Sequence, residues 1–345
     1  MPAVTVHPAE ELRFPGVPRT DQPPEHVRVD CNSPAHWSGD TLYMFYSEGH
    51  PYRSAGPDLF HLSAAVKTRF DNETEWNHSQ QGPRWAEATY KAPDGRLYMW
   101  YHNEPPRVCN RPDLTAPRIG QMVSEDDGLN FRDQGLILEG PADALACDTP
   151  NKYFTGGNGD FCVNVDADRR YVYFFISTYN RNRTEQGVSV ARMNHADLPA
   201  PVGKVFKWHA GRWAEPGLRG HVSPIFPGDW HRPDADAFWG PSVHWNHYLR
   251  RWVMLLNRAR DKDWNQEGIY VSFNADLADP GGWTPARKIL DRAQFGPGSG
   301  QWYPQVVGLD AARRETDKLA GRRARLFIAG RSRFEIEFHR PGRTP

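Results

Sequence analysis

One strand–turn–strand unit recurs five times along the 345-residue chain, and this repetition constrains the fold more than any other feature. Each copy has an apolar strand, a short polar turn and a second strand rich in aromatic residues. The copies begin near residues 27, 85, 159, 237 and 302. A further strand pattern follows each copy, at 59–66, 119–124, 187–192, 268–273 and 334–339. A recurring unit of this kind is typical of repeat architectures, whose units bury a core only together.

The repeats predict an all-β fold, a single five-bladed β-propeller domain covering residues 1–345. The chain ends after the third strand of the fifth copy. We therefore expect residues 1–26, with a strand within 3–14, to supply the missing fourth strand and close the ring. A pair of β-sandwiches is the alternative, but five copies of one unit favour the propeller.

The charge balance and hydropathy exclude several classes of protein. Lys plus Arg and Asp plus Glu both number 42, so no basic field is available for a nucleic acid. No apolar run approaches the roughly 18 residues of a membrane span. The first residues lack a charged stretch followed by an apolar one. We therefore expect a cytoplasmic protein with no nucleic-acid or membrane partner, and the sequence leaves its oligomeric state open.

The four cysteines show no metal-binding spacing. Cys31 and Cys162 fall in apolar strand patterns, where a free buried thiol is expected. Cys109 and Cys147 fall in loops and could pair, which the sequence does not decide. A cytoplasmic location favours reduced thiols throughout.

Three carboxylates occupy matching places near the openings of the first three repeats. They are Asp30, Glu87 and Asp160. The first strands of propeller blades line the central channel, so these groups are expected to converge there. Crowded carboxylates split their pKa values, which leaves one protonated and another ionised. Glycoside hydrolysis requires such a pair, so the three are predicted to be catalytic.

The motif Ser124–Phe131 matches the S-x-D-x-G-x-x-aromatic Asp-box of sialidases and related propellers, a structural hairpin turn. The whole layout resembles the five-bladed glycoside hydrolases of families 43, 32, 68 and 117. That resemblance implies that Asp30 is the base or nucleophile and that Asp160 orients substrate and tunes the acid. In family 43 the acid is a Glu of the fourth blade, and this chain has Trp239 at that place.

The departure at Trp239 requires another acid. Glu87 is our first choice, ahead of Glu104, Asp236 and His221. Arg84 and His102 are expected to add polar contacts, and an arginine in the channel would suit an anionic sugar. Aromatic residues at the blade openings are expected to stack on sugar rings. They are Trp37, Trp85, Trp239, Trp302 and Tyr303.

The expected function is a glycoside hydrolase acting on an oligo- or polysaccharide, with carbohydrate as its partner. No cofactor or metal is predicted, although some relatives hold a structural cation in the channel. The alternatives are a non-hydrolytic carbohydrate-binding propeller or a polysaccharide lyase, which Trp239 favours. A protein-interaction propeller ranks last because these repeats are long and irregular. A sialidase is disfavoured because it needs six blades and an arginine triad.

Overall fold

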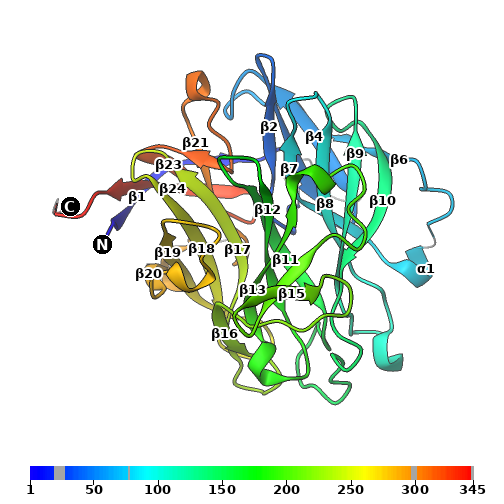
Figure 1. Ribbon diagram of the computed structural model, residues 1–345. Coiled ribbons are helices and arrows are strands. Elements are labelled where there is room, and N and C mark those ends of the chain that lie inside the picture. The colour runs from blue at the N-terminus through cyan, green and yellow to red at the C-terminus, as the bar shows by residue number, and fades with distance from the viewer. Residues whose placement is uncertain (19–27, 77, 297–300, 343–345) are drawn as a thin grey trace.

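The computed structural model describes residues 1–18, 28–76, 78–296 and 301–342, and it is built almost entirely of β-strands (Figure 1). Its α-helix α1 spans only His78–Gln81. The short 3-10 helices are Val108–Asn110, Arg183–Glu185, His195–Asp197, Pro280–Gly282, Arg292–Gln294 and Ala311–Arg313. None of the helices in these described ranges has the length and apolar character required to cross a bilayer.

Hydrogen bonds group the described strands into four sheets. The first contains β2 (Ala35–Ser38), β3 (Thr41–Ser47), β4 (Pro51–Gly56) and β5 (Val66–Lys67). The second contains β7 (Arg84–Lys91), β8 (Leu97–Asn103), β9 (Arg118–Ser124), β10 (Asn130–Leu138) and β6 (Arg69–Phe70). The last contains β21 (Pro304–Gly308), β23 (Arg323–Ile328), β24 (Arg331–His339) and β1 (Ala3–Arg13).

The remaining sheet has eleven strands and includes both the third and the fourth repeats. Its first part holds β11 (Asn158–Val165), β12 (Tyr171–Thr178), β13 (Gly187–Asn194), β14 (Phe206–His209) and β15 (Arg212–Pro216). Its second part holds β17 (Asp236–Asn246), β18 (Arg251–Ala259), β19 (Gln266–Asn274), β20 (Arg287–Asp291) and β22 (Leu319–Ala320). The parts are joined because β16 (Phe226–Asp229) pairs with both β13 and β17.

All five predicted hairpins are present, as β2–β3, β7–β8, β11–β12, β17–β18 and β21–β23. Two boundaries in the first repeat were wrong. The strand expected over 27–37 is confined to Ala35–Ser38, and the third strand is Pro51–Gly56 rather than 59–66. Residue 27 lies outside the described residues.

The N-terminal strand completes the last sheet, as predicted for residues 3–14. Strand β1 runs antiparallel to β24, with Ala3 opposite His339 and Arg13 opposite Arg331. Figure 1 shows the blue start of the chain beside its red end. Residues 19–26 of the expected closing segment lie outside the described part of the chain.

The first strands of the repeats meet at the centre of the molecule. Strand β2 contacts β7, β7 contacts β11, β11 contacts β17, and β17 contacts β21. The segment before β2 ties this centre together, because the Asn32 amide donates to the carbonyls of Phe161 and Pro241. Gln305 exchanges two hydrogen bonds with the backbone of Ser33. A polar group on one first strand therefore lies within reach of groups on the others.

The Asp-box forms the expected hairpin turn between β9 and β10. The Ser124 hydroxyl accepts the Gly128 N–H at 2.9 Å, and the Asp126 carboxylate accepts the Asn130 N–H at 2.9 Å. Gly128 takes a φ of +84°, which a residue with a Cβ rarely adopts. Phe131 is 2% exposed and packs near the rings of Phe45 and Phe70.

Two of the four cysteines are joined in a disulfide, contrary to the expectation of reduced thiols. Cys109 and Cys147 form a disulfide with their Cα atoms 5.5 Å apart, so reduced thiols were the wrong prediction for this pair. The loops bring the two side chains together, which the sequence left undecided. Cys31 and Cys162 are free and buried, as predicted.

Candidate functional site

Three central strands carry a β-bulge where they approach the predicted carboxylates. The register of β7 shifts between Ala86 and Ala88, that of β11 between Gly159 and Phe161, and that of β17 between Trp239 and Ser242. A bulge inserts a residue into one strand and re-aims its side chain. The inserted residues are Glu87 in β7 and Asp160 in β11. Asp160 has a φ of 41°, which is uncommon outside glycine.

A cavity of about 160 Å³ opens at this end of the central strands, and we call it the acidic pocket. Its lining residues are Asp30, Trp85, His102, Glu104, Tyr153, Phe154, Asp160, Trp239, Trp264, Trp302 and Tyr303. The structure therefore brings together eight of the thirteen residues proposed from sequence. These eight are Asp30, Trp85, His102, Glu104, Asp160, Trp239, Trp302 and Tyr303.

Three carboxyl groups face this pocket, and burial raises the pKa of each. The pKa of Asp30 rises to about 7 through burial and then through the nearby carboxylate of Asp160. That of Asp160 rises to about 6 through burial and the neighbouring Glu87. Burial raises the pKa of Glu104 to about 7, and Asp160 and Asp30 add to the rise. The pocket therefore holds both protonated and ionised carboxyls near neutral pH.

The Asp160 carboxylate keeps the lowest pKa of the three because donors surround it. It is 3% exposed and accepts the hydroxyl of Tyr179. His102 and the hydroxyls of Tyr179 and Tyr303 each lower its pKa against the effect of burial. Asp160 is therefore the carboxyl that ionises first as pH rises.

Glu87, our first choice of acid, lies behind the lining of the pocket. Its side chain is fully buried, and its carboxylate accepts the Phe161 N–H at 3.0 Å and contacts Nδ1 of His102. The prediction that it converges with Asp160 is confirmed, since both groups and His102 present atoms within 4.8 Å of one another. Its position does not support the expected role as the acid, because Glu87 is absent from the lining of the pocket.

His102 connects Glu87 to the carboxyl that does face the pocket. Nε2 of His102 lies 3.6 Å from the Glu104 carboxylate, and Nδ1 faces Glu87. The Trp85 ring stacks on the imidazole at 4.7 Å with an interplanar angle of 21°. Each ring nitrogen of His102 therefore faces a carboxyl, although only Nδ1 is hydrogen-bonded to one.

Part of the lining of the pocket is a group of aromatic rings around Trp239. Trp264 meets it edge-on at 4.8 Å, Tyr303 at 5.8 Å and Trp302 at 6.1 Å. The Trp239 indole donates to Gln266, so this residue brings no acidic group where family 43 has its acid. Among the described residues, the Trp85 indole N–H is buried without a hydrogen-bond partner and is available to a ligand.

Two of these aromatic residues hold a strained backbone. Tyr303 has a φ of 59° and Trp264 a φ of 64°. Bulky residues seldom occupy this region, and such strain gathers at functional sites. Trp264 is held by its indole N–H, which donates to Asn151 at 3.0 Å.

Sequence reasoning missed three lining residues, namely Trp264, Tyr153 and Phe154. Trp264 lies between β18 and β19, and the other two lie in the long connection from β10 to β11. Two kinds of connection return to the end where a first strand begins: those from a second strand to a third, and those from a fourth strand to the next first strand. Aromatic residues in those connections were the available signal.

Arg84 and Trp37 do not line the pocket, where the sequence had led us to expect them. The Arg84 guanidinium is 1% exposed and lies between the rings of Phe70 and Trp76, at 4.1 and 4.0 Å. It pairs with Asp133 at 3.3 Å rather than with a substrate. Trp37 lies beside the β2–β3 turn and donates its indole N–H to the backbone carbonyl of Glu315, in the connection from β21 to β23.

His221 and Asp236, two other candidate acids, also lie outside the lining of the pocket. The His221 ring is 43% exposed and bonds to Glu185 at 2.7 Å. Asp236 is 45% exposed and forms an ion pair with Arg258 at 2.8 Å. Both side chains satisfy their charge at the surface and neither lines the pocket, so neither can act as the missing acid.

The cluster of Glu87, His102 and Asp160 offers two carboxylates and an imidazole within 4.8 Å, a set that could ligate a metal. Protein donors already occupy these groups, since Glu87 accepts the Phe161 N–H and Asp160 accepts the Tyr179 hydroxyl. Hydrogen bonding thus accounts for the cluster, and the absence of a metal stays a prediction.

No protein-family model and no curated sequence matches the chain. Solved structures do match. A thermostable family-43 glycoside hydrolase aligns at a TM-score of 0.53 and 13% identity over 91% of this chain and 89% of that chain. An α-L-arabinanase mutant of Cellvibrio cellulosa aligns at 0.51 and 13%, over 90% and 91%. An exo-β-1,3-galactanase of Phanerochaete chrysosporium, holding β-1,3-galactotriose, aligns at 0.50 and 10%, over 95% of this chain and 64% of that chain.

These identities show a shared fold, and at that level the predicted resemblance to family 43 is confirmed. Fold alone does not assign a reaction, which has to be argued from the site.

Proposed function

We propose that the protein is a glycoside hydrolase in which Glu104 is the general acid and Asp30 is the base or nucleophile. The observation that carries this proposal is the meeting of Asp30, Glu104 and Asp160 around one small pocket. Glycoside hydrolysis uses one protonated and one ionised carboxyl on either side of the scissile bond. The pKa values of about 7 for Asp30 and Glu104 allow either group to hold a proton near neutral pH.

Glu104 takes the acid role because it is the third carboxyl in the pocket and its pKa of about 7 keeps it largely protonated below that pH. Nε2 of His102 lies 3.6 Å from the Glu104 carboxylate, which is close but longer than a direct hydrogen bond. Glu87 acts through His102 by fixing the orientation of the ring. Asp160 remains ionised, so it disfavours a second negative charge nearby and helps Glu104 to keep its proton.

The lining of the pocket supports a neutral sugar as substrate. It contains three carboxyls and one histidine, and none of its described residues is an arginine or lysine that could pair with a uronate. Aromatic faces pack against the C–H groups of sugar rings, and the free Trp85 N–H can meet a hydroxyl. A volume of about 160 Å³ is roughly that of five waters, which suits one sugar unit rather than a long chain segment.

We further propose that the fold is one domain with five blades. Five hairpins follow the five repeats, and their first strands contact one another in the order β2, β7, β11, β17, β21. In this view the strand β16 bridges the third and fourth blades.

A non-hydrolytic carbohydrate-binding protein or a lyase is the second candidate. Trp239 favours it, because the indole stands where family 43 brings its acid and is committed to Gln266. In that case the three carboxyls would bind sugar hydroxyls without cleaving a bond.

The test is a hydrolysis screen on aryl glycosides of arabinose, galactose and xylose, and on arabinan and β-1,3-galactan. We expect turnover that Asp30→Asn abolishes and that the surface control Asp234→Asn leaves unchanged. Asp234 is 72% exposed and bonds to Arg232. Sugar binding without turnover in the parent protein would instead support the second candidate, and a hydrolysis rate unaffected by Asp30→Asn would contradict the role assigned to Asp30.

A further inference from the structure

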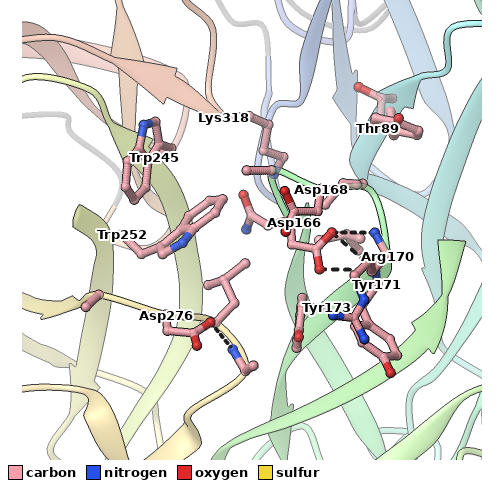
Figure 2. Close-up of a pocket in the computed structure, with 18 residues that line it drawn as sticks. Thr89, Asp166, Asp168, Arg170, Tyr171, Tyr173, Trp245, Trp252, Asp276 and Lys318 are labelled. Carbon is pink, nitrogen blue, oxygen red and sulfur yellow. Dashed lines mark hydrogen bonds between the residues drawn. The ribbon is translucent and has the colours of Figure 1, made fainter. Parts of the chain in front are cut away.

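A second and larger cavity, of about 600 Å³, is drawn in Figure 2, and its lining residues come from the other ends of β11 and β17. We call it the far cavity. On β11, Asp160 lines the acidic pocket whereas Asn164 lines the far cavity. On β17 the corresponding residues are Trp239 and Trp245. At about 3.3 Å per residue, these steps separate the two sites by roughly 13–20 Å. The far cavity is therefore distinct from the proposed active site.

Two buried polar side chains in the far cavity have no hydrogen-bond partner within the described residues. They are the hydroxyl of Thr89 and the amide nitrogen of Asn164. Each residue is only 4% exposed. Leaving such a group unsatisfied costs about 1–3 kcal/mol, so a ligand or water that bonds to it would stabilise the protein. A ligand with hydroxyl groups would satisfy both, since a hydroxyl donates and accepts.

A pair of tryptophans forms one wall of the far cavity. Trp245 and Trp252 face each other across β17 and β18, with ring centroids 5.3 Å apart and planes at 63°. Figure 2 shows both indoles on one side of the cavity, with Arg170 and Thr89 on the other. Both rings are half-buried, so they leave aromatic surface for a ligand to cover.

The charged groups of the far cavity are mixed in sign. Asp166 and Asp276 each accept backbone N–H groups in their own turns, at 2.7 and 2.9 Å, and retain lone pairs for further donors. Lys318 lies among them and pairs with Asp317 at 3.0 Å. The negative charge of a phosphate would be repelled by the carboxylates, and the positive charge of a metal ion would be repelled by Lys318. A neutral ligand rich in hydroxyls meets neither obstacle.

We propose that the far cavity is a second carbohydrate-binding site that holds a neutral sugar unit. The unit would stack on Trp245 and Trp252 and hydrogen-bond to Thr89 and Asn164. This site goes beyond the proposed hydrolase, and it stands whether or not the acidic pocket cleaves a glycoside.

The experiment is ¹⁹F NMR of the full chain labelled with 5-fluorotryptophan, which gives one signal for each of the 13 tryptophans. Trp245→Phe and Trp252→Phe assign the two signals from the far cavity. The probes are galactose, arabinose, xylose and glucose, with galacturonate, glucosamine and calcium chloride as charged comparisons. We expect a neutral sugar to shift both signals with a millimolar Kd, and Asp30→Asn to leave that Kd unchanged.

Asn164→Leu should raise this Kd on the order of five-fold, as loss of one hydrogen bond predicts. Trp252→Ala, at a half-buried position, provides a second variant should Asn164→Leu fail to fold, and it should abolish the shift of the Trp245 signal. The proposal is overturned if no neutral sugar moves the two signals at concentrations up to about 50 mM. It is equally overturned if only the charged probes move them, or if both variants bind as the parent does.

Discussion

Replacing Asp30 by Asn removes a carboxyl whose ionised form is destabilised in the folded protein. Burial and the neighbouring Asp160 raise the pKa of Asp30 from 3.8 to about 7. Above pH 4 the unfolded chain releases this proton while the folded protein keeps it, so the folded state binds more protons. The free energy of unfolding therefore falls as pH rises from about 4 to about 7, and Asn, which cannot ionise, escapes this loss.

The magnitude follows from the shift of about three pKa units. At about 1.4 kcal/mol per unit, the loss between pH 5 and pH 8 would be about 3 kcal/mol for a fully buried group. Asp30 is partly exposed, and solvent screening reduces this to about 1.5 kcal/mol. At the usual unfolding entropy per residue, a chain of 345 residues converts that energy into about 2 °C in Tm.

Scanning calorimetry at pH 5 and pH 8 measures this effect without any substrate. Between the two pH values, the parent protein should lose about 2 °C more in Tm than Asp30→Asn does. Asp234→Asn, at an exposed ion pair, should follow the parent. Equal pH dependence in the parent and Asp30→Asn, or a lower Tm for Asp30→Asn at pH 8, would refute the raised pKa.

Further predictions concern the acid, its support and the stability of the fold. Glu104→Gln should lower kcat/KM about 10²–10⁴-fold on unactivated glycosides and far less on activated aryl glycosides, and should remove the fall in rate above pH 7 that its pKa of about 7 implies in the parent. Gly82→Ala should lower activity and Tm together, because Gly82 has a φ of +81° and an added Cβ would lie 1.8 Å from the Glu104 carbonyl oxygen. Replacing both Cys109 and Cys147 by Ser should cost about 3–4 kcal/mol in urea denaturation, since the disulfide closes a loop of 38 residues. Phe131→Ala should cost about 3–5 kcal/mol by the same measurement, because the ring that fills the Asp-box turn is 2% exposed.

The choice between Glu87 and Glu104 shows where sequence reasoning stopped. Both residues fall at the same end of the β7–β8 hairpin, and strict alternation along β7 would set the face of Glu87. The bulge between Ala86 and Ala88 breaks that alternation, and one inserted residue changes which side each following residue faces. The position of a bulge depends on how the strand pairs with its neighbours. The local pattern of residues does not specify that pairing.

Local sequence patterns were sufficient to predict the all-β class, the five hairpins and the N-terminal strand that completes the last sheet. Those features rest on alternation of apolar residues and on turn chemistry, which act between near neighbours. The same patterns also placed Asp30 and Asp160 near the openings of their repeats, and both line the acidic pocket, although Asp30 lies in the segment before β2 and not in a strand. Long-range packing places Trp264, from a distant loop, in the lining of the pocket. It also buries Arg84 between aromatic rings and directs Glu104 to the pocket. These outcomes depend on contacts between residues far apart in the chain, and only the packed fold supplies them.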